Sequence, residues 1–315
     1  MPEVTIASKA ERLEQMIART KGIPPVRVAV VYPCDKESLR GPVQAAEAGV
    51  IAPILVGPEA KIRAIAAEFG VNLANLRIAE AADEHAACAE AIRLVHAGEA
   101  EALMKGSLHT DELMGAIVAS ANNLRTSRRV SHVFVMDVPT YPRPMLITDA
   151  AVNIAPTLEA KVDITQNAIY LAHALGISEP KVAILAAVET VNPKMQSTLE
   201  AAALCKMADR GQIKGGVLDG PLAFDNAVSE EAARIKGIKS PVAGQADIFV
   251  VPGLESGNML FKQLEYLSHA LTAGIVLGAK VPVILTSRAD TAETRVASCV
   301  VASLLAHYNR QNKGA

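Results

Sequence analysis

Short apolar runs rich in β-branched residues alternate along the chain with longer segments in which apolar residues recur every three or four positions. The first pattern predicts buried strands and the second predicts amphipathic helices, so the alternation predicts an α/β fold with a largely parallel sheet. The predicted strands are 27–31, 52–56, 102–104, 133–136, 145–147, 182–186, 216–218, 248–251 and 283–285. The predicted helices are 9–20, 39–48, 59–69, 84–95, 110–119, 162–175, 193–210, 230–235, 260–272 and 292–308.

One stretch departs from this alternation. The apolar runs on either side of 137–144 are joined by a proline-rich segment too short for a crossover helix, which predicts an antiparallel hairpin or arm over 133–147. The length of 315 residues fits two domains, and a hairpin inserted between two α/β halves marks a junction. We expect a first domain of residues 1–127 and 278–315 and a second domain of residues 128–277.

Composition narrows the classes of function. A formal net charge of −2 and an aromatic content of 3% without Trp argue against a nucleic-acid-binding protein. The cysteines lie far apart without C-x-x-C spacing, and the histidines lack metal-ligand spacing, so we expect reduced thiols and no metal. Neither a signal peptide nor an uncharged apolar run long enough to span a bilayer is evident. These features predict a soluble cytoplasmic protein with no membrane partner.

Polar residues follow the predicted strands, where open parallel sheets bind their ligands. The segment 105–110 (KGSLHT) brings a cation, a flexible backbone and a hydroxyl together just before a helix. His109 in this segment has three open interpretations: a general base, a phosphate ligand or a residue of the helix start. The sequence contains neither G-x-x-x-x-G-K-[ST] nor G-x-G-x-x-G, so it carries no nucleotide-hydrolase or dinucleotide fingerprint.

The segment 286–291 (TSRADT) lies between an apolar run and the long final helical pattern. Ser287, Arg288 and Asp290 place a hydroxyl, a guanidinium and a carboxylate at this strand-to-helix junction. A helix start favours anions because its first N–H groups lack internal partners, and a guanidinium suits phosphate or carboxylate oxygens. The alternative is an ordinary N-cap formed by Ser287, Asp290 or Thr291, with Arg288 in solvent.

A basic group of Arg125, Arg128 and Arg129 precedes the predicted strand 133–136. It is either a solvated cluster or, at a domain junction, a set of guanidinium groups that reaches a cleft and holds a polyanionic ligand.

Taken in order, the polar loops resemble those of the phosphate acetyltransferase and phosphate butyryltransferase family over nearly the whole chain. The segments that carry the resemblance are KGSLHT at 105–110, TDAAVNI at 148–154, DGPLAFD at 219–225, SPVAGQAD at 240–247, PGLESGN at 252–258 and Ser287-Arg288. The resemblance implies the fold of the isocitrate and isopropylmalate dehydrogenase superfamily. That fold has two three-layer α/β/α domains with an active cleft between them, and its members are usually homodimers.

The resemblance also implies a reaction: reversible transfer of a short acyl group, such as acetyl, propionyl or butyryl, between CoA and inorganic phosphate. Acyl-CoA, phosphate and acyl phosphate are the substrates and products, the thiolate attacks acyl phosphate directly in a ternary complex, and no tightly bound cofactor is needed. Ser287 would donate a hydrogen bond to the CoA sulfur as it becomes a thiolate, and Arg288 would bind the phosphate or acyl oxygen. The residues expected to contact phosphate or the acyl group are Gly106, Ser107, His109, Thr110, Arg128, Arg129 and Asn153. Those expected to contact CoA are Asp225, Glu255, Gly257 and Asn258.

Two positions depart from the acetyl-specific members. Those members carry an Asp seven residues after the serine, which is proposed as the base for the CoA thiol. This chain has Thr294 at that position, and Glu293 and Asp290 are the nearby carboxylates that could replace the Asp as the base. They also carry an arginine where this chain has Met114, and an arginine at 128–129 would have to supply that charge. Both departures favour the butyryl or broader-acyl branch.

Two alternatives remain open from the sequence. One is an NAD- and metal-dependent dehydrogenase of the same superfamily, with Asp219 and Asp225 as metal ligands. The other is a non-catalytic protein that binds CoA or acyl phosphate, which the neutral Thr294 would suit.

Overall fold

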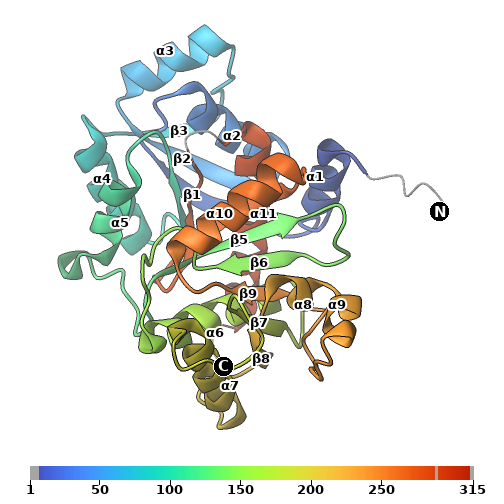
Figure 1. Ribbon diagram of the computed structural model, residues 1–315. Helices are drawn as coiled ribbons and strands as arrows, with labels where there is room; N and C mark the ends of the chain where they lie inside the picture. Colours follow the sequence, from blue (N-terminus) through green and yellow to red (C-terminus); the bar gives the residue numbers. More distant parts are fainter. Residues whose placement is uncertain (1–6, 288–289, 313–315) are drawn as a thin grey trace. The chain divides into compact units, whose positions relative to one another are not determined.

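The computed structural model describes residues 7–287 and 290–312, which form two compact units. The terminal unit contains the described residues of Ala7–Arg128 and Ala273–Ala315, and the central unit contains Arg129–Thr272. Both units combine β-strands with α-helices (Figure 1), which confirms the predicted α/β class. The domain boundaries predicted at 127/128 and 277/278 stay predictions, because a division into compact units does not show that each unit folds as a domain.

Parallel strands form most of the sheet in the terminal unit, in the order β3-β2-β1-β4-β11, and β10 pairs with β11 in antiparallel orientation. The inner strands are continuous apolar runs, as expected of strands buried on both faces. The strands are β1 (Val26–Val31), β2 (Ile51–Gly57), β3 (Arg77–Glu80), β4 (Ala102–Lys105), β10 (Leu271–Leu277) and β11 (Val283–Ile284). The helices are α1 (Lys9–Ala18), α2 (Lys36–Glu47), α3 (Glu59–Phe69), α4 (Glu84–His96), α5 (Thr110–Val118) and α11 (Ala292–Asn312), with a 3₁₀ turn at Ser120–Asn122.

In the central unit the strand order is β5-β6-β9-β7-β8. The pair β5–β6 is antiparallel, in agreement with the hairpin predicted over 133–147, and the other pairs are parallel. The strands are β5 (Ser131–Asp137), β6 (Met145–Thr148), β7 (Lys181–Leu185), β8 (Val217–Leu222) and β9 (Ile248–Val250). The helices are α6 (Leu158–Ala174), α7 (Gln196–Asp209), α8 (Phe224–Val228), α9 (Glu230–Ile235) and α10 (Leu254–Leu267).

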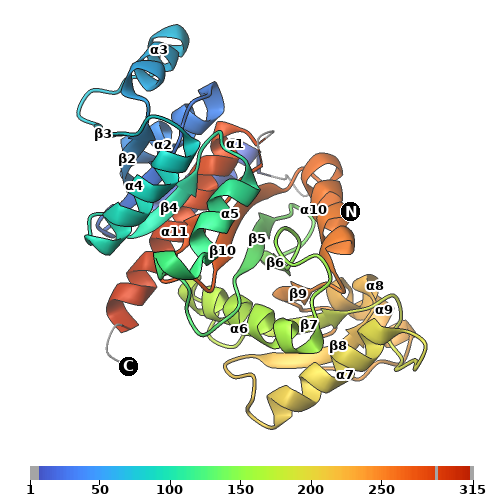
Figure 2. The ribbon, with the colours of Figure 1, turned by 90° about the vertical axis from the view of Figure 1, so that its left-hand side faces the viewer.

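In each unit, helices pack against the sheet or against one another. In the central unit α10 covers the sheet through Phe261, whose ring stacks on Phe134 with the ring centroids 3.7 Å apart. In the terminal unit α11 packs on α2, and α4 lies beside α5 (Figures 1 and 2). Within the described residues, no helix is long and apolar enough to cross a membrane.

Strand order in the terminal unit decides where its polar loops lie. Strands β1, β4 and β11 are adjacent and parallel, with Val31 beside Lys105 and Met104 beside Ile284. Their carboxyl ends therefore meet at one edge of the sheet, where a ligand site is expected.

Candidate active site

The loop after β4 is held by buried interactions. The Lys105 side chain is buried, and its Nζ donates hydrogen bonds to the carbonyl oxygens of Gly106 (3.2 Å) and Leu108 (3.1 Å). These bonds fold the backbone back over the ammonium group, and α5 then begins at Thr110 with His109 as its N-cap residue. The His109 side chain is exposed to solvent. The expected phosphate loop thus has a buried anchor and an exposed end.

The loop after β1, which was not among the polar loops expected from the sequence, contacts the loop after β4. The N–H and the hydroxyl of Ser107 both donate to the carbonyl oxygen of Tyr32 (each 2.9 Å), and the N–H of Cys34 donates to Ser107 Oγ (3.2 Å). Tyr32 has a φ of 54°, an unusual value for a bulky residue, and its hydroxyl accepts from Lys61 Nζ (3.2 Å). The position of this loop, directly after the predicted strand 27–31, is the signal that could have identified it.

The segment that follows β11 presents Ser287. Thr286 and Asp290 are buried, whereas Ser287 is exposed. The N–H of Ser287 donates to Asp290 Oδ2 (2.7 Å), and the N–H of Asp290 donates to the Ser287 carbonyl oxygen (3.2 Å). Arg288 lies outside the described residues. Because β4 and β11 are parallel neighbours, the segments 105–110 and 286–291 leave the same edge of the sheet.

The two carboxylates proposed as substitutes for the family's base differ in their surroundings. Asp290 is buried and accepts the N–H of Ser287, whereas Glu293 is exposed and accepts from the hydroxyl of Thr291 (2.9 Å). The Thr291 hydroxyl also accepts the N–H of Thr294 (3.4 Å), so Thr291 caps the start of α11. The N-cap interpretation therefore holds for Thr291, and the base stays a prediction for both carboxylates.

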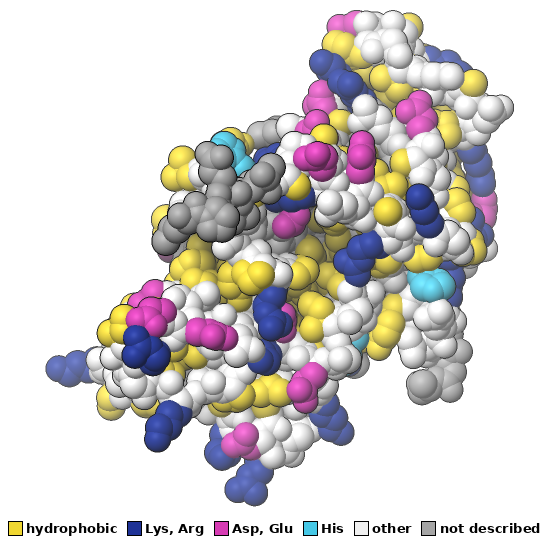
Figure 3. All heavy atoms as spheres, turned by 90° about the vertical axis from the view of Figure 1, so that its right-hand side faces the viewer, with side chains coloured by type: hydrophobic (Ala, Val, Ile, Leu, Met, Phe, Trp, Pro, Cys, Tyr) yellow, Lys and Arg dark blue, Asp and Glu magenta, His cyan; other side chains and the backbone are white. Residues whose placement is uncertain are grey.

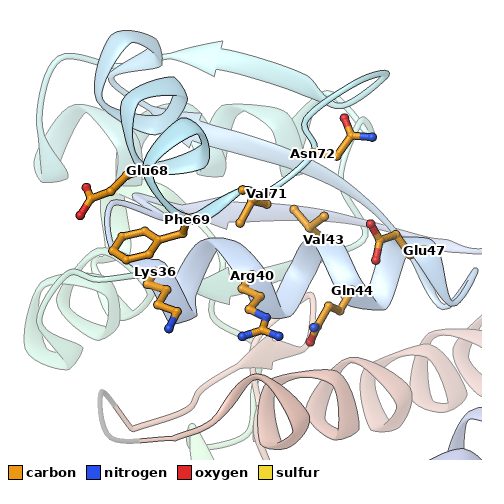
Figure 4. Close-up of a pocket in the computed structure, with 10 residues that line it drawn as sticks. Lys36, Arg40, Val43, Gln44, Glu47, Glu68, Phe69, Val71 and Asn72 are labelled. Carbon is orange, nitrogen blue, oxygen red and sulfur yellow. The ribbon is translucent and has the colours of Figure 1, made fainter.

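Two hollows lie along α2, and one of them adjoins the start of α11. One, of about 440 Å³, is lined by Arg40 and Gln44 of α2 and by residues 290–293. The other, of about 530 Å³, shares Arg40 and Gln44 and extends to Phe69 at the end of α3. Figure 4 shows the side chains of Lys36, Arg40 and Gln44 spaced along α2, with Phe69 close to Lys36. Both volumes lie in the range of small-molecule sites.

In the central unit, Asp149 organises the loop after β6. Its buried carboxylate accepts the N–H groups of Ala151, Val152 and Asn153 at 3.0 to 3.2 Å, together with the Asn153 side-chain amide at 2.6 Å. Arg129 Nη1 donates to Asn153 Oδ1 (3.4 Å), so these two predicted ligands lie together. Arg128, in the terminal unit, is exposed, and its N–H donates to Thr126 Oγ1 (3.2 Å).

The residues expected to contact CoA lie on two different helices. Glu255, Gly257 and Asn258 are on α10, where Asn258 Nδ2 donates to the Ala150 carbonyl oxygen (3.3 Å). Gly257 permits this packing, because a β-carbon there would lie 2.8 Å from Ala150 Cβ. Asp225 lies instead on α8, where its carboxylate pairs with Lys236 (3.1 Å); the hydrogen bond from that ammonium lowers the pKa of Asp225.

Burial shapes the reactivity of the thiols. Loss of solvation raises the pKa of Cys34 to about 11, although the ammonium of Lys61 acts in the opposite direction. The pKa values of Cys88, Cys205 and Cys299 are raised by burial to about 12. All four thiols are therefore protonated at neutral pH, and a thiol is a far weaker nucleophile than a thiolate.

Among the residues that the structure describes, no group of three or more His, Cys, Asp or Glu side chains is placed to hold a metal ion. Asp219, one of the two candidate ligands of the dehydrogenase alternative, accepts the N–H of Gly220 through Oδ1 (2.8 Å). Among the described residues, Asp219 and Asp225 thus belong to no group of three such side chains that could hold this metal.

Residues 85–303 match the family described as Phosphate acetyl/butaryl transferase, and this match includes the segments 105–110 and 286–291. The chain belongs to the phosphate acetyl/butyryl transferase family. It is 59% identical over 303 residues to a phosphate acetyltransferase of Rhizobium meliloti, covering 96% of each chain. It is 42% identical over 301 residues to a phosphate butyryltransferase of Clostridium beijerinckii, covering 96% of this chain and 100% of the relative.

Solved structures agree with the family. A branched-chain phosphotransacylase from Enterococcus faecalis V583 is similar with a TM-score of 0.78 and 33% identity, over 90% of this chain and 99% of the other. A 4-hydroxythreonine-4-phosphate dehydrogenase from Klebsiella pneumoniae is similar in fold, with a TM-score of 0.57 at 12% identity, over 90% of this chain and 99% of the other. The chain is therefore a transferase with a dehydrogenase-like fold, which confirms the resemblance and excludes a dehydrogenase as its family.

Proposed function

We propose that the chain catalyses the reversible transfer of a short acyl group between CoA and inorganic phosphate. Membership of the phosphate acetyl/butyryl transferase family carries this proposal, because the match covers both strand-end segments of the terminal unit. Relatives named as acetyl- and butyryltransferases align over 96% of this chain in each case, so acetyl, propionyl and butyryl groups are the candidates for transfer.

The mechanism we propose is direct attack of the CoA thiolate on acyl phosphate in a ternary complex. The raised pKa of every thiol in the chain supports it, because an acyl-cysteine intermediate would need a thiolate nucleophile. In this scheme the Ser287 hydroxyl donates a hydrogen bond to the CoA sulfur as negative charge develops. Arg288, outside the described residues, is proposed to bind the phosphate or acyl oxygen.

Other proposed contacts follow the polar loops of each unit. In the terminal unit, Gly106 and Ser107 lie in the loop anchored by Lys105, and His109 and Thr110 start α5. Asp111 and Glu112 stand in the first turn of α5 and weaken its attraction for an anion, so a phosphate at this loop needs a guanidinium partner. Arg129 and Asn153 of the central unit are proposed ligands of phosphate or the acyl group, and Arg128 of the terminal unit is proposed for the same role. The proposed CoA contacts are Asp225, Glu255, Gly257 and Asn258.

We also propose a homodimer. On α10 the side chains of Met259, Tyr266 and Leu267 are 67%, 60% and 74% exposed, so an apolar face of this helix is uncovered in the single chain. Sedimentation of the purified chain at several concentrations measures the oligomeric state directly, and a monomer at all of them would contradict the dimer.

Nucleic acid and membranes are not among the proposed partners. The face in Figure 3 has Lys and Arg side chains interspersed with Asp and Glu side chains, without one continuous basic surface. The four free cysteines suit the reducing conditions of the cytoplasm, which is the location we propose.

The deciding experiment measures phosphate-dependent release of CoA from acetyl-, propionyl- and butyryl-CoA with a thiol reagent. We expect release that requires phosphate and follows one acyl length best, with no requirement for NAD. Binding of CoA without turnover of any acyl length would favour the non-catalytic alternative. A titration in which NAD and a divalent metal bind while CoA does not would overturn the proposal.

A further inference from the structure

Arg295 is one of the largest fully buried side chains in the described part of the chain, with 1% of its surface exposed. It lies in the first turn of α11 and packs across Gly41 of α2. A β-carbon at position 41 would lie 2.6 Å from Arg295 Cβ and 2.8 Å from its Cδ, so the glycine makes room for the arginine. An apolar side chain of similar volume would fill this space without burying a charge. Packing alone therefore does not account for a guanidinium here.

The guanidinium contacts the backbone segment that carries Ser287. Nη1 of Arg295 donates to Thr286 Oγ1 (2.8 Å), and Nη2 donates to the carbonyl oxygen of Ser287 (3.1 Å). On the other side, the N–H of Ser287 donates to the carboxylate of Asp290 (2.7 Å). A cation and an anion thus hold the carbonyl and the N–H of the same residue. The Ser287 side chain remains exposed between these two contacts.

The surroundings of Arg295 disfavour its positive charge through desolvation, and nearby carboxylates offset part of this effect. Burial lowers the pKa of its guanidinium, and the carboxylates of Asp35, Asp290 and Glu37 act in the opposite direction. Within the described residues, Nε of Arg295 has no hydrogen-bond acceptor. The guanidinium therefore makes its side-chain hydrogen bonds through the two terminal nitrogens, both to the segment 286–287.

We infer that Arg295 is a positioning residue for acyl transfer. By fixing the backbone at Thr286 and Ser287, it directs the Ser287 hydroxyl toward the CoA sulfur on which negative charge develops. Arg295 does not touch the substrate in this scheme. Its role rests on the proposed function and on the role proposed for Ser287. Because a small displacement of a catalytic group lowers the rate steeply, loss of the guanidinium should act on kcat more than on KM.

The first test compares Arg295→Met with Arg295→Lys. Arg295→Met fills a similar volume without charge, so we expect kcat to fall roughly 10- to 100-fold while KM for acyl-CoA changes by less than about 3-fold. Its melting temperature is measured in parallel, because the substitution removes the desolvation cost of a buried charge but also leaves Thr286 Oγ1 and the Ser287 carbonyl oxygen without this donor. Arg295→Lys keeps the charge but has no planar fork for two acceptors, so its kcat should lie between those of the wild type and Arg295→Met.

Arg310→Met is the matched control on the same helix. Arg310, which is partly exposed, pairs with Glu101 (2.8 Å) and donates to the Pro24 carbonyl oxygen; neither contact involves the segment 286–287. We expect it to leave kcat unchanged. A fall in kcat for Arg310→Met equal to that for Arg295→Met would show a general effect of altering α11 and would overturn the inference.

A double-mutant cycle tests the route of the effect. Thr286→Val removes the acceptor of Nη1 while keeping the shape of the side chain. If Arg295 acts through Thr286, Thr286→Val alone lowers kcat. Adding Thr286→Val to Arg295→Met then lowers kcat by a smaller factor than in the wild type. Fully independent effects would overturn the proposed route.

Ser287→Ala, measured in parallel, separates the inference from the function on which it rests. An active wild type, an impaired Ser287→Ala and an unimpaired Arg295→Met would overturn the positioning role alone. An active wild type with an unimpaired Ser287→Ala would overturn the role of Ser287 and, with it, that of Arg295. Absence of phosphate-dependent CoA release from the wild type would overturn the proposed function and both roles.

Discussion

The α-carbon of Gly106 lies against the backbone of Tyr32 so closely that a β-carbon at position 106 would lie 2.4 Å from the Tyr32 carbonyl oxygen. The same β-carbon would lie 2.3 Å from the carbonyl oxygen of Val31. Both are backbone atoms at the end of a buried strand, and they cannot rotate away as a side chain can. The loops after β1 and β4 are thus joined at a point where only glycine fits.

Replacing Gly106 with alanine should therefore disturb the fold. We expect Gly106→Ala to lower the free energy of unfolding by about 3 kcal/mol, at the upper end of typical overpacking costs, and to abolish CoA release. Urea denaturation measures the change. Gly115→Ala is the control, because a β-carbon on this helical glycine meets no atom within 4 Å. It should raise the free energy of unfolding by about 0.5–1 kcal/mol, and equal losses in the two variants would contradict the steric explanation.

Removing the hydroxyl of Ser287 should impair chemistry more than binding. The hydrogen bond to sulfur strengthens as the thiolate forms, so it stabilises the transition state more than the ground state. We expect Ser287→Ala to lower kcat about 100-fold, as for the loss of one oxyanion donor, with a Kd for CoA near that of the wild type. Steady-state kinetics and calorimetry measure the two effects. The exposed Ser120→Ala serves as the control, and full activity in Ser287→Ala would refute the assigned role.

The carboxylate of Asp149 should be needed to shape the loop after β6. Asparagine would replace one acceptor oxygen by a donor amide facing N–H groups, and it would remove the charge that strengthens the remaining bonds. We expect Asp149→Asn to lower the free energy of unfolding by about 2–3 kcal/mol, measured by urea denaturation. In Asp209→Asn, whose side chain is 61% exposed in the wild type, the change should stay within about 0.5 kcal/mol. A similarly small change in Asp149→Asn would contradict the prediction.

Acid should remove a stabilising contact that ties α11 to the start of β1. Desolvation raises the pKa of Glu101, but hydrogen bonds from Arg310 and Arg27 outweigh it and lower the pKa from 4.5 to about 2. Because the folded-state pKa is the lower one, the contribution of Glu101 is fully present above about pH 4.5 and is lost as the pH falls toward 2. The stability difference between the wild type and Glu101→Gln should therefore narrow over this interval. Urea denaturation at successive pH values measures it, and a constant difference would exclude the linkage.

Strand prediction worked where burial on both faces leaves a continuous β-branched run, as in β1 and β2. It missed β10, and the predicted helix 260–272 runs past the observed end of α10 at Leu267. The chain turns after α10 at His269, which has a φ of 52°. This left-handed conformation is usual for glycine, so a histidine gives no sign of the turn in the sequence. Gly274 lies inside β10, and because glycine is depleted in strands it made the strand harder to predict. In the structure the N–H of Gly274 donates to Ser298 Oγ (3.0 Å).

The candidate site was predictable to the extent that it follows strands directly. Lys105 and Ser287 could be identified because each lies in a segment that directly follows an apolar run, and open parallel sheets bind ligands beyond the carboxyl ends of such strands. Arg295 could not, because a charged residue in a helical pattern ordinarily faces solvent. Its burial depends on Gly41, on a helix far away in the sequence, which no local pattern reveals.

The protonated state of Cys34 has a consequence for an enzyme that releases a free thiol. Cys34 is partly exposed and lies beside Ser107, in the loop proposed to contact phosphate. Exchange with oxidised CoA would require its thiolate, which a pKa of about 11 makes scarce at neutral pH. Desolvation thus keeps Cys34 in the unreactive thiol form. It thereby also protects the proposed site from being blocked by a mixed disulfide between Cys34 and CoA, the product of the proposed reaction.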